Sequence, residues 1–249
     1  MLNDSLYITI LESITSKFEP ILDTKFEDIN IKDSEFAKIF QINFVDSENV
    51  LGKEDICIYI PKVDINIYKD VYQYTYYFEY KNFLEIPYLD LNGDKLFKIY
   101  DFTPIVNIIK NINGYKDSLS IEIKTALLVS FLMAHEFGHA LDYLLNNGEF
   151  CCNDVSPDLL CLFKRFPHLD NYDVRSKCEQ AFIKIEIEDK KNKLNFDKES
   201  EKISHNEYFN EISRLDNLYR NLCGESIADE YAVNILNAID IIEILTSIS

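Results

Sequence analysis

The segment HEFGH at residues 135–139 places two histidines and a glutamate within one of the most apolar stretches of the chain, FLMAHEFGHALDYLL. On a helix, positions i and i+4 share a face, so His135 and His139 can direct an imidazole nitrogen at one point. Zn²⁺ suits such donors, and burying them without a partner would cost free energy. Glu136 lies one position further round, where it suits water activation rather than metal binding. The pattern predicts a metal site, with an ordinary buried helix as the alternative.

Two further features of this segment favour the metal site. The chain contains four histidines, and two of them lie in this motif. Gly138 lies between them in mid-helix, where glycine costs roughly 1 kcal/mol relative to alanine. We therefore predict that something requires a close backbone approach at Gly138.

A catalytic zinc site takes three protein ligands, so one more donor is needed. The other histidines, His168 and His205, do not form the His-x-x-Gly-x-x-His continuation that would supply it nearby. In CGESIADEYAVNIL, Glu225 and Asp229 have the i, i+4 spacing of one helix face. We expect Glu225 to bind the metal and Asp229 to accept the second N–H of a ligating histidine. Taken alone, these acids also fit the solvated face of an amphipathic helix.

The elements that must position these residues begin with a helix predicted over 3–18, capped by Asn3 or Asp4. Between about 40 and 101, ICIYIPKVDINIY and YQYTYYFEYKNFLEIPYLDL are rich in Ile, Tyr and Phe with partial alternation, which is typical of strands. Asn92-Gly93 favours a hairpin, because these residues tolerate the positive φ angles of a tight turn.

From residue 119 the pattern is helical. We predict one helix over 119–146, ended by Asn146-Asn147-Gly148. Two charged helical pieces follow within 170–215, and the polar segment EIEDKKNKLNFDKESEK between them is either a flexible connection or an exposed helix. A final helix is predicted from about Glu225.

These elements predict an α+β fold in a single domain, residues 1–249. The strand-rich residues 1–118 would pack on the mostly helical residues 119–249, and we expect a ligand groove between the two parts. Chain length and ordinary apolar content suit one domain with a sizeable core.

Composition excludes several partners. The formal net charge of −18 opposes non-specific binding to nucleic acid. The N-terminus lacks the basic region and apolar run of a signal peptide, and the longest apolar run, around 126–134, is too short to span a bilayer. The six cysteines form no CxxC pair, so we expect reduced thiols, including Cys151 and Cys152. The prediction is a cytoplasmic protein with neither a nucleic-acid nor a membrane partner.

HExxH followed downstream by a helical glutamate resembles the gluzincin zinc metallopeptidases. The segment ESIADEYAVNIL is similar to the third-ligand helix of soluble ImmA/IrrE-like and M48-like peptidases, and HEFGHALDYLL is similar to the active-site helix of anthrax lethal factor-like peptidases. The resemblance covers roughly residues 120–146 and 219–237. It implies a zincin-like active-site helix, zinc as cofactor, and Glu136 as general base. The zinc ligands it implies are His135, His139 and Glu225, with Asp229 supporting a ligand.

Two departures from that family pattern affect the assignment. Glu225 follows His139 by 86 positions, which implies an inserted helical section over 150–215. No histidine follows Glu225, so the histidine that stabilises the oxyanion in some gluzincins has no counterpart here. Lethal factor-like peptidases use a tyrosine a few residues before the third ligand, which makes Tyr219 the candidate. The alternatives are Tyr231 and His205.

The function implied is zinc-dependent hydrolysis of peptide bonds by water that zinc and Glu136 activate. The substrate is a protein or peptide, with a regulatory protein as one candidate. A strand from 72–101 would pair with an extended substrate. The alternative is a zinc-binding interaction or sensor protein that cleaves nothing. The sequence does not predict an oligomeric state.

Overall fold

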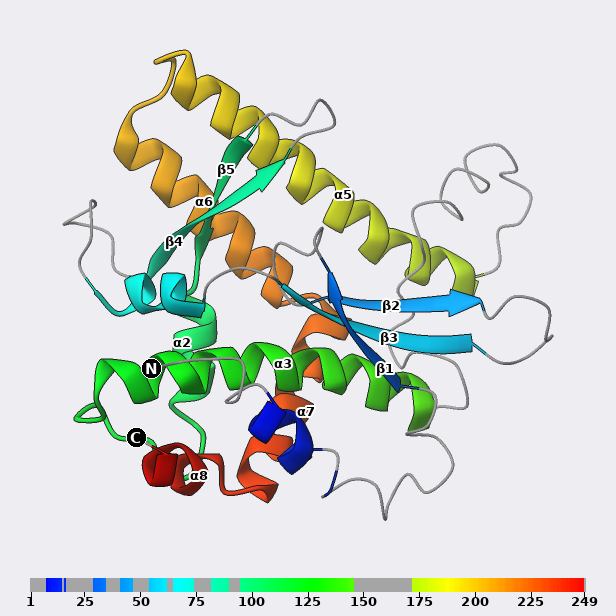
Figure 1. The fold of residues 1–249 in the computed structure, drawn as a ribbon. Helices are drawn as coiled ribbons and strands as arrows, with labels where there is room; N and C mark the ends of the chain where they lie inside the picture. Colours follow the sequence, from blue (N-terminus) through cyan, green and yellow to red (C-terminus); the bar gives the residue numbers. More distant parts are fainter. Residues whose placement is uncertain are drawn as a thin grey trace.

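The computed structural model describes residues 8–14, 16, 29–34, 41–46, 54–61, 65–73, 82–89, 95–145 and 172–248. In these residues the strands all lie before residue 102, and the chain after that point is helical (Figure 1). This arrangement agrees with the predicted α+β class. The division into parts at residue 118 and the inserted section remain predictions.

The described strands form two small sheets. In the first, β1 (Ile29–Ser34) pairs parallel with β3 (Glu54–Pro61), and β2 (Gln41–Asp46) pairs antiparallel with β3 on its other side. In the second, β4 (Phe83–Leu89) and β5 (Lys95–Asp101) form an antiparallel pair.

The β4–β5 pair confirms the predicted hairpin. Leu89 lies opposite Lys95, so the chain reverses between them as expected. The turn residues Asn92 and Gly93 lie outside the described residues.

The segment after β3 differs from the prediction of a strand through residue 68. Ile65–Val71 forms a 3₁₀ helix, η2. Tyr68 and Val71 are both buried, and three residues per turn places them on one face. In a strand, residues of opposite parity would point to opposite faces, so only the helical turn buries both side chains in the same core.

Most predicted helices are present. Residues 8–14 are helical within the predicted range 3–18, and the long helix predicted over 119–146 spans Ile121–Leu145. Its predicted stop at 146–148 lies outside the described residues. Among the helices of the described residues, none is long and apolar enough to cross a membrane. The helices are α2 (Thr103–Ile109), α3 (Ile121–Leu145), α5 (Tyr172–Glu199), α6 (His205–Arg220), α7 (Cys223–Ala238) and α8 (Ile241–Ile248).

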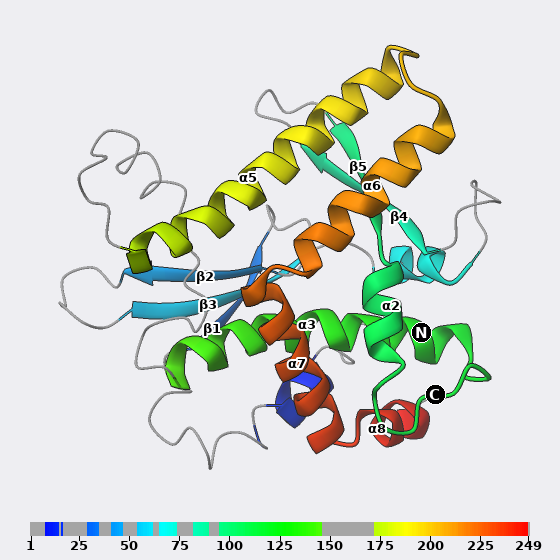
Figure 2. The same cartoon turned by 180° about the vertical axis from the view of Figure 1, so that it is seen from behind.

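The polar segment 186–202 is mostly an exposed helix rather than a flexible connection. It forms the C-terminal half of α5, in which Ile187 and Lys191 are buried four residues apart on one face. The chain then turns into α6 through a capping box, in which Ser204 and Glu207 satisfy each other's backbone N–H groups. α5 and α6 thus form an antiparallel helical hairpin against β4 and β5 (Figures 1 and 2).

A buried polar cluster fastens this hairpin to β5. Asp216 of α6 accepts a hydrogen bond from the backbone N–H of Asp101 at 2.8 Å and pairs with Lys191 of α5. Ser213 donates to the Asp101 carboxylate at 2.5 Å. Asp101, Lys191 and Asp216 are all buried, so each charge depends on its partners to stay in place.

Helix α3 runs through the middle of the molecule and forms the centre of the main core (Figure 1). Leu127, Leu128 and Phe131 are fully buried, as expected for a helix that is apolar on most faces. The buried hydroxyls of Thr125 and Ser130 each donate to the carbonyl four residues earlier, at 2.7 Å. This core also receives side chains from residues 8–14, η2, α2, α7 and α8.

Helix α7 crosses α3 at Gly138 (Figure 2). A Cβ added at Gly138 would lie 2.6 Å from the carbonyl oxygen of Ala228, 3.0 Å from its Cα and 3.1 Å from Cβ of Tyr231. Side chains do not normally tolerate contacts this short. The predicted close approach of backbone to Gly138 is therefore confirmed, and α7 is the element that approaches.

Replacing Gly138 with alanine tests this contact. In an unobstructed helix the change would stabilise by roughly 1 kcal/mol. Here the added methyl group meets the Ala228 backbone, so we expect Gly138→Ala to lower the free energy of unfolding by about 1–3 kcal/mol. Urea denaturation measures this free energy of unfolding. The control is Glu230→Ala on the exposed face of α7, which we expect to change stability by at most about 0.5 kcal/mol. A Gly138→Ala variant as stable as the native protein would contradict the contact.

Candidate metal centre

Three predicted ligands meet at one point. His135 and His139 lie one turn apart on α3, and Glu225 lies in the first turn of α7. The two Nε2 atoms are 3.1 Å apart. Nε2 of His135 lies 3.2 Å from Oε2 of Glu225, and Nε2 of His139 lies 3.8 Å from Oε1. The group lies in the interior, with one donor atom from each residue within 4.8 Å of the others, so it can hold a metal ion.

The spacing of these donors suits a small divalent ion. Tetrahedral bonds of about 2.0–2.1 Å to nitrogen and carboxylate oxygen separate neighbouring donors by about 3.3 Å. The three measured separations, from 3.1 to 3.8 Å, bracket that value. Two imidazoles and one carboxylate are also the donor set of catalytic zinc sites.

Asp229 lies where the sequence predicted it, one turn after Glu225. Its Oδ1 is 2.9 Å from Nδ1 of His135. In the neutral ring, an N–H donated from Nδ1 to Asp229 leaves the lone pair of Nε2 directed at the other donors, which is the tautomer that metal binding requires.

Ion pairing determines the charges within this buried group. Burial and the charge of Arg220 lower the pKa of His135, but Asp229 and Glu225 outweigh both and raise it to about 9. Burial alone would raise the pKa of Glu225, yet the hydrogen bond and charge of His135 hold it well below its usual value. Burial and the neighbouring His135 charge lower the pKa of His139 to about 3. The carboxylate is therefore charged and His139 is neutral, as metal binding requires, whereas His135 carries a proton that a metal at Nε2 would displace.

Tyr219 lies beside the ligands, in the last turn of α6. Burial, the charges of Glu225 and Glu136, and a hydrogen bond with Glu225 together raise the pKa of its phenol well above the usual value. The phenol is therefore a neutral hydrogen-bond donor. Glu136 is half-buried on α3 and close enough to Tyr219 to affect its pKa.

Of the two alternatives to Tyr219, His205 lies far from the centre and Tyr231 lies at the crossing of α3 and α7. His205 begins α6, about 21 Å along the helix axis from Tyr219 at 1.5 Å per residue. It lines a separate pocket of about 480 Å³ between the β4–β5 pair and the α5–α6 hairpin, with Tyr208 and Lys198. Tyr231 packs its Cβ near Gly138 at the crossing of α3 and α7. His168 lies outside the described residues, as do Cys151 and Cys152.

Two cations at the centre were not predicted from the sequence. Arg220, at the end of α6, donates from Nη1 to Oε2 of Glu225 at 3.3 Å and from Nη2 to Oδ1 of Asp229. Lys184 of α5 donates from Nζ to Oε1 of Glu225 at 2.9 Å. Arg220 directly follows Tyr219 in the sequence, so its place near the centre could have been predicted. Lys184 lies 41 positions before Glu225, and no sequence pattern links it to the centre.

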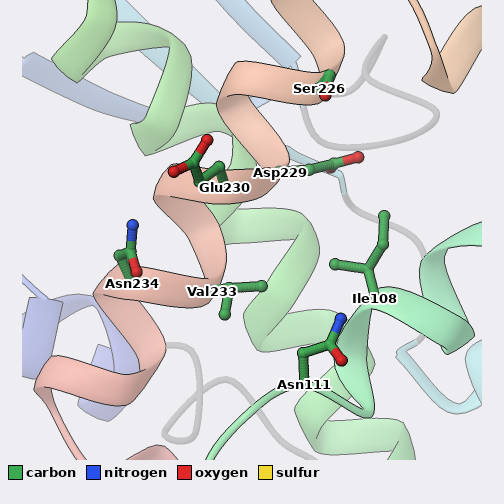
Figure 3. A pocket seen from close by; sticks show the side chains of 7 residues that line it. All are labelled: Ile108, Asn111, Ser226, Asp229, Glu230, Val233 and Asn234. Carbon is green, nitrogen blue, oxygen red and sulfur yellow. The ribbon is translucent and has the colours of Figure 1, made fainter.

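A pocket of about 310 Å³ borders the centre between α2 and α7 (Figure 3). Figure 3 shows Ser226 and Asp229 on the side of α7 nearer to Ile108, whereas Glu230 projects to the other side. Of the residues described around the centre, Asp229 is the one that also lines this pocket. Asp229 is therefore the residue that the pocket and the centre share, and none of the three donors lines the pocket.

Comparison with known proteins does not assign the chain to a family. No protein-family model matches it, and neither a curated protein nor a solved structure shows significant similarity to it. The interpretation of the centre therefore depends on its own geometry.

Metal analysis of purified protein tests the ligand set. We expect one zinc ion per chain in the native protein, and loss or strong weakening of binding in His135→Ala and Glu225→Ala, because each removes one of three donors. His205→Ala removes a histidine outside the centre and should retain full zinc. Elemental analysis after dialysis gives the readout, and full zinc in Glu225→Ala would mean that another residue is the third ligand.

Proposed function

We propose that the protein is a zinc-dependent metalloendopeptidase that hydrolyses peptide bonds in a protein or peptide substrate. The observation that carries the proposal is the convergence of His135, His139 and Glu225 from two helices, with Asp229 on the outer nitrogen of His135. In this proposal α3 is the active-site helix of a zincin-like fold, and α7 carries the third ligand. Zinc bound there would supply Lewis-acid activation of water and of the scissile carbonyl.

Glu136 is the proposed general base. It follows His135 directly on α3, remains half-buried, lies near enough to Tyr219 to raise the pKa of that phenol, and is not one of the three donors. In peptide hydrolysis the base takes a proton from the attacking water and gives it to the leaving amine as the C–N bond breaks. A carboxylate next to the ligands can carry that proton between the two positions.

Tyr219 is the proposed donor to the developing oxyanion. Its phenol stays protonated at neutral pH and lies beside both Glu225 and Glu136. A neutral O–H fixed by the surrounding protein stabilises negative charge on the carbonyl oxygen as it becomes tetrahedral. Its ring also lies under the ammonium of Lys184, 5.5 Å from the ring centroid, which restrains its orientation.

The Glu136→Gln variant separates catalysis from metal binding. The amide keeps the size of the side chain but cannot accept the proton, so we expect turnover of an unstructured protein substrate such as casein to fall by at least about 10²-fold. Zinc content should stay at the native level, with a chelator-treated native sample as the inactive control. Full activity in Glu136→Gln would exclude this residue as the base. Native protein that holds zinc but cleaves nothing would instead favour the interaction or sensor function.

The Tyr219→Phe variant tests the oxyanion donor. Removing one such donor typically costs about 10²–10³ in kcat. We expect a loss of that size in kcat with zinc content retained, since the phenol is not one of the three donors. Tyr231→Phe is the matched control and should keep native kcat. Equal losses in the two variants would contradict the assignment of Tyr219.

A further inference from the structure

Helix α5 supplies a positive charge to a residue that binds the metal in the proposed function. Lys184 donates to Oε1 of Glu225 at 2.9 Å, and Glu225 is 3% exposed. The Lys184 side chain is 25% exposed, so its ammonium is largely removed from solvent screening. Helix α5 is part of the α5–α6 hairpin, which the buried Asp216 connects to β5. Through Lys184, this helix also contacts the metal centre.

Two other groups already hold the Glu225 carboxylate. Arg220 contacts Oε2 at 3.3 Å, and the phenol of Tyr219 forms a hydrogen bond with the same side chain. The orientation of Glu225 therefore does not depend on Lys184 alone. The effect that only Lys184 supplies is a full positive charge at Oε1, the carboxylate oxygen nearer to His139.

A positive charge at this place has two opposite effects on metal binding. It stabilises Glu225 in its charged form, which favours binding, and it repels a divalent cation held by the same carboxylate, which opposes binding. Coulomb energy scales with the product of the charges, so the ammonium repels a doubly charged ion twice as strongly as it would a singly charged one at the same place. Since Arg220 and Tyr219 also keep Glu225 in place, repulsion is the larger effect.

We propose that the charge that Lys184 places at Oε1 of Glu225 lowers the affinity of the metal centre for a divalent cation. Helix α5 thereby limits how tightly the metal is held. The inference rests on the metal-binding part of the proposed function. It does not depend on peptide hydrolysis.

The test measures zinc affinity by competition with a chromophoric chelator, for the full chain and three variants. Lys184→Met removes the charge and keeps the length of the side chain. Lys184→Arg keeps the charge. Lys190→Met is the matched control, because Lys190 also lies on α5 but pairs with Glu186 at 2.6 Å on the exposed surface. Circular dichroism establishes folding, and Lys184→Gln replaces Lys184→Met if the latter does not fold.

We expect Lys184→Met to bind zinc at least about tenfold more tightly than the native protein, as removal of a like charge within a few ångströms should allow. Lys184→Arg and Lys190→Met should stay within about threefold of native, since neither changes the charge at Glu225. Equal or weaker binding by Lys184→Met would overturn the inference and leave the metal site standing. No zinc binding by the native protein would overturn the proposed function itself.

Discussion

The contact between the backbones of α3 and α7 determines where each donor of the metal centre lies. Gly138 is between the two histidines in sequence, and Ala228 is between Glu225 and Asp229. Because α7 meets α3 at this pair, the same contact brings Glu225 to the Nε2 atoms and Asp229 to the Nδ1 atom of His135. A side chain at Gly138 would separate the helices, and the carboxylates would lose both sets of contacts together. The glycine that allows this contact has a cost in helix propensity.

Several charged side chains lie in the interior around this contact. His135, Glu225 and Asp229 are buried, and Arg220 and Lys184 supply opposite charge from the α5–α6 hairpin. Removing one partner from such a group leaves an uncompensated charge, which is far more costly than the pair itself. Fold and centre therefore depend on each other: the helices bring the charges together, and the pairing of the charges allows these helices to pack.

Local patterns were enough to predict α3, α7 and their side chains at the centre. The i, i+4 spacing of the histidines and of Glu225 with Asp229 needs only helix geometry, and the unfavourable Gly138 indicated a close neighbour. Tyr219 came from a resemblance, and the structure places it beside Glu225. The strand expected through residue 68 was wrong because alternation is a local signal, whereas the burial of Tyr68 and Val71 on one face is a tertiary effect. Lys184 could not be predicted, since its role depends on how the α5–α6 hairpin packs.

The order of the donors along the chain has a consequence for biosynthesis. His139, the later of the two histidines, is made 86 residues before Glu225, so at ribosomal rates of 5–20 residues per second the two are separated by about 4–17 s. During that interval a nascent chain offers a metal two imidazoles without the carboxylate, and α3 lacks the helix that covers Gly138. The complete centre forms only when α7 has emerged and docked. Metal binding by all three donors would therefore be a late event in folding, after the surrounding structure is in place.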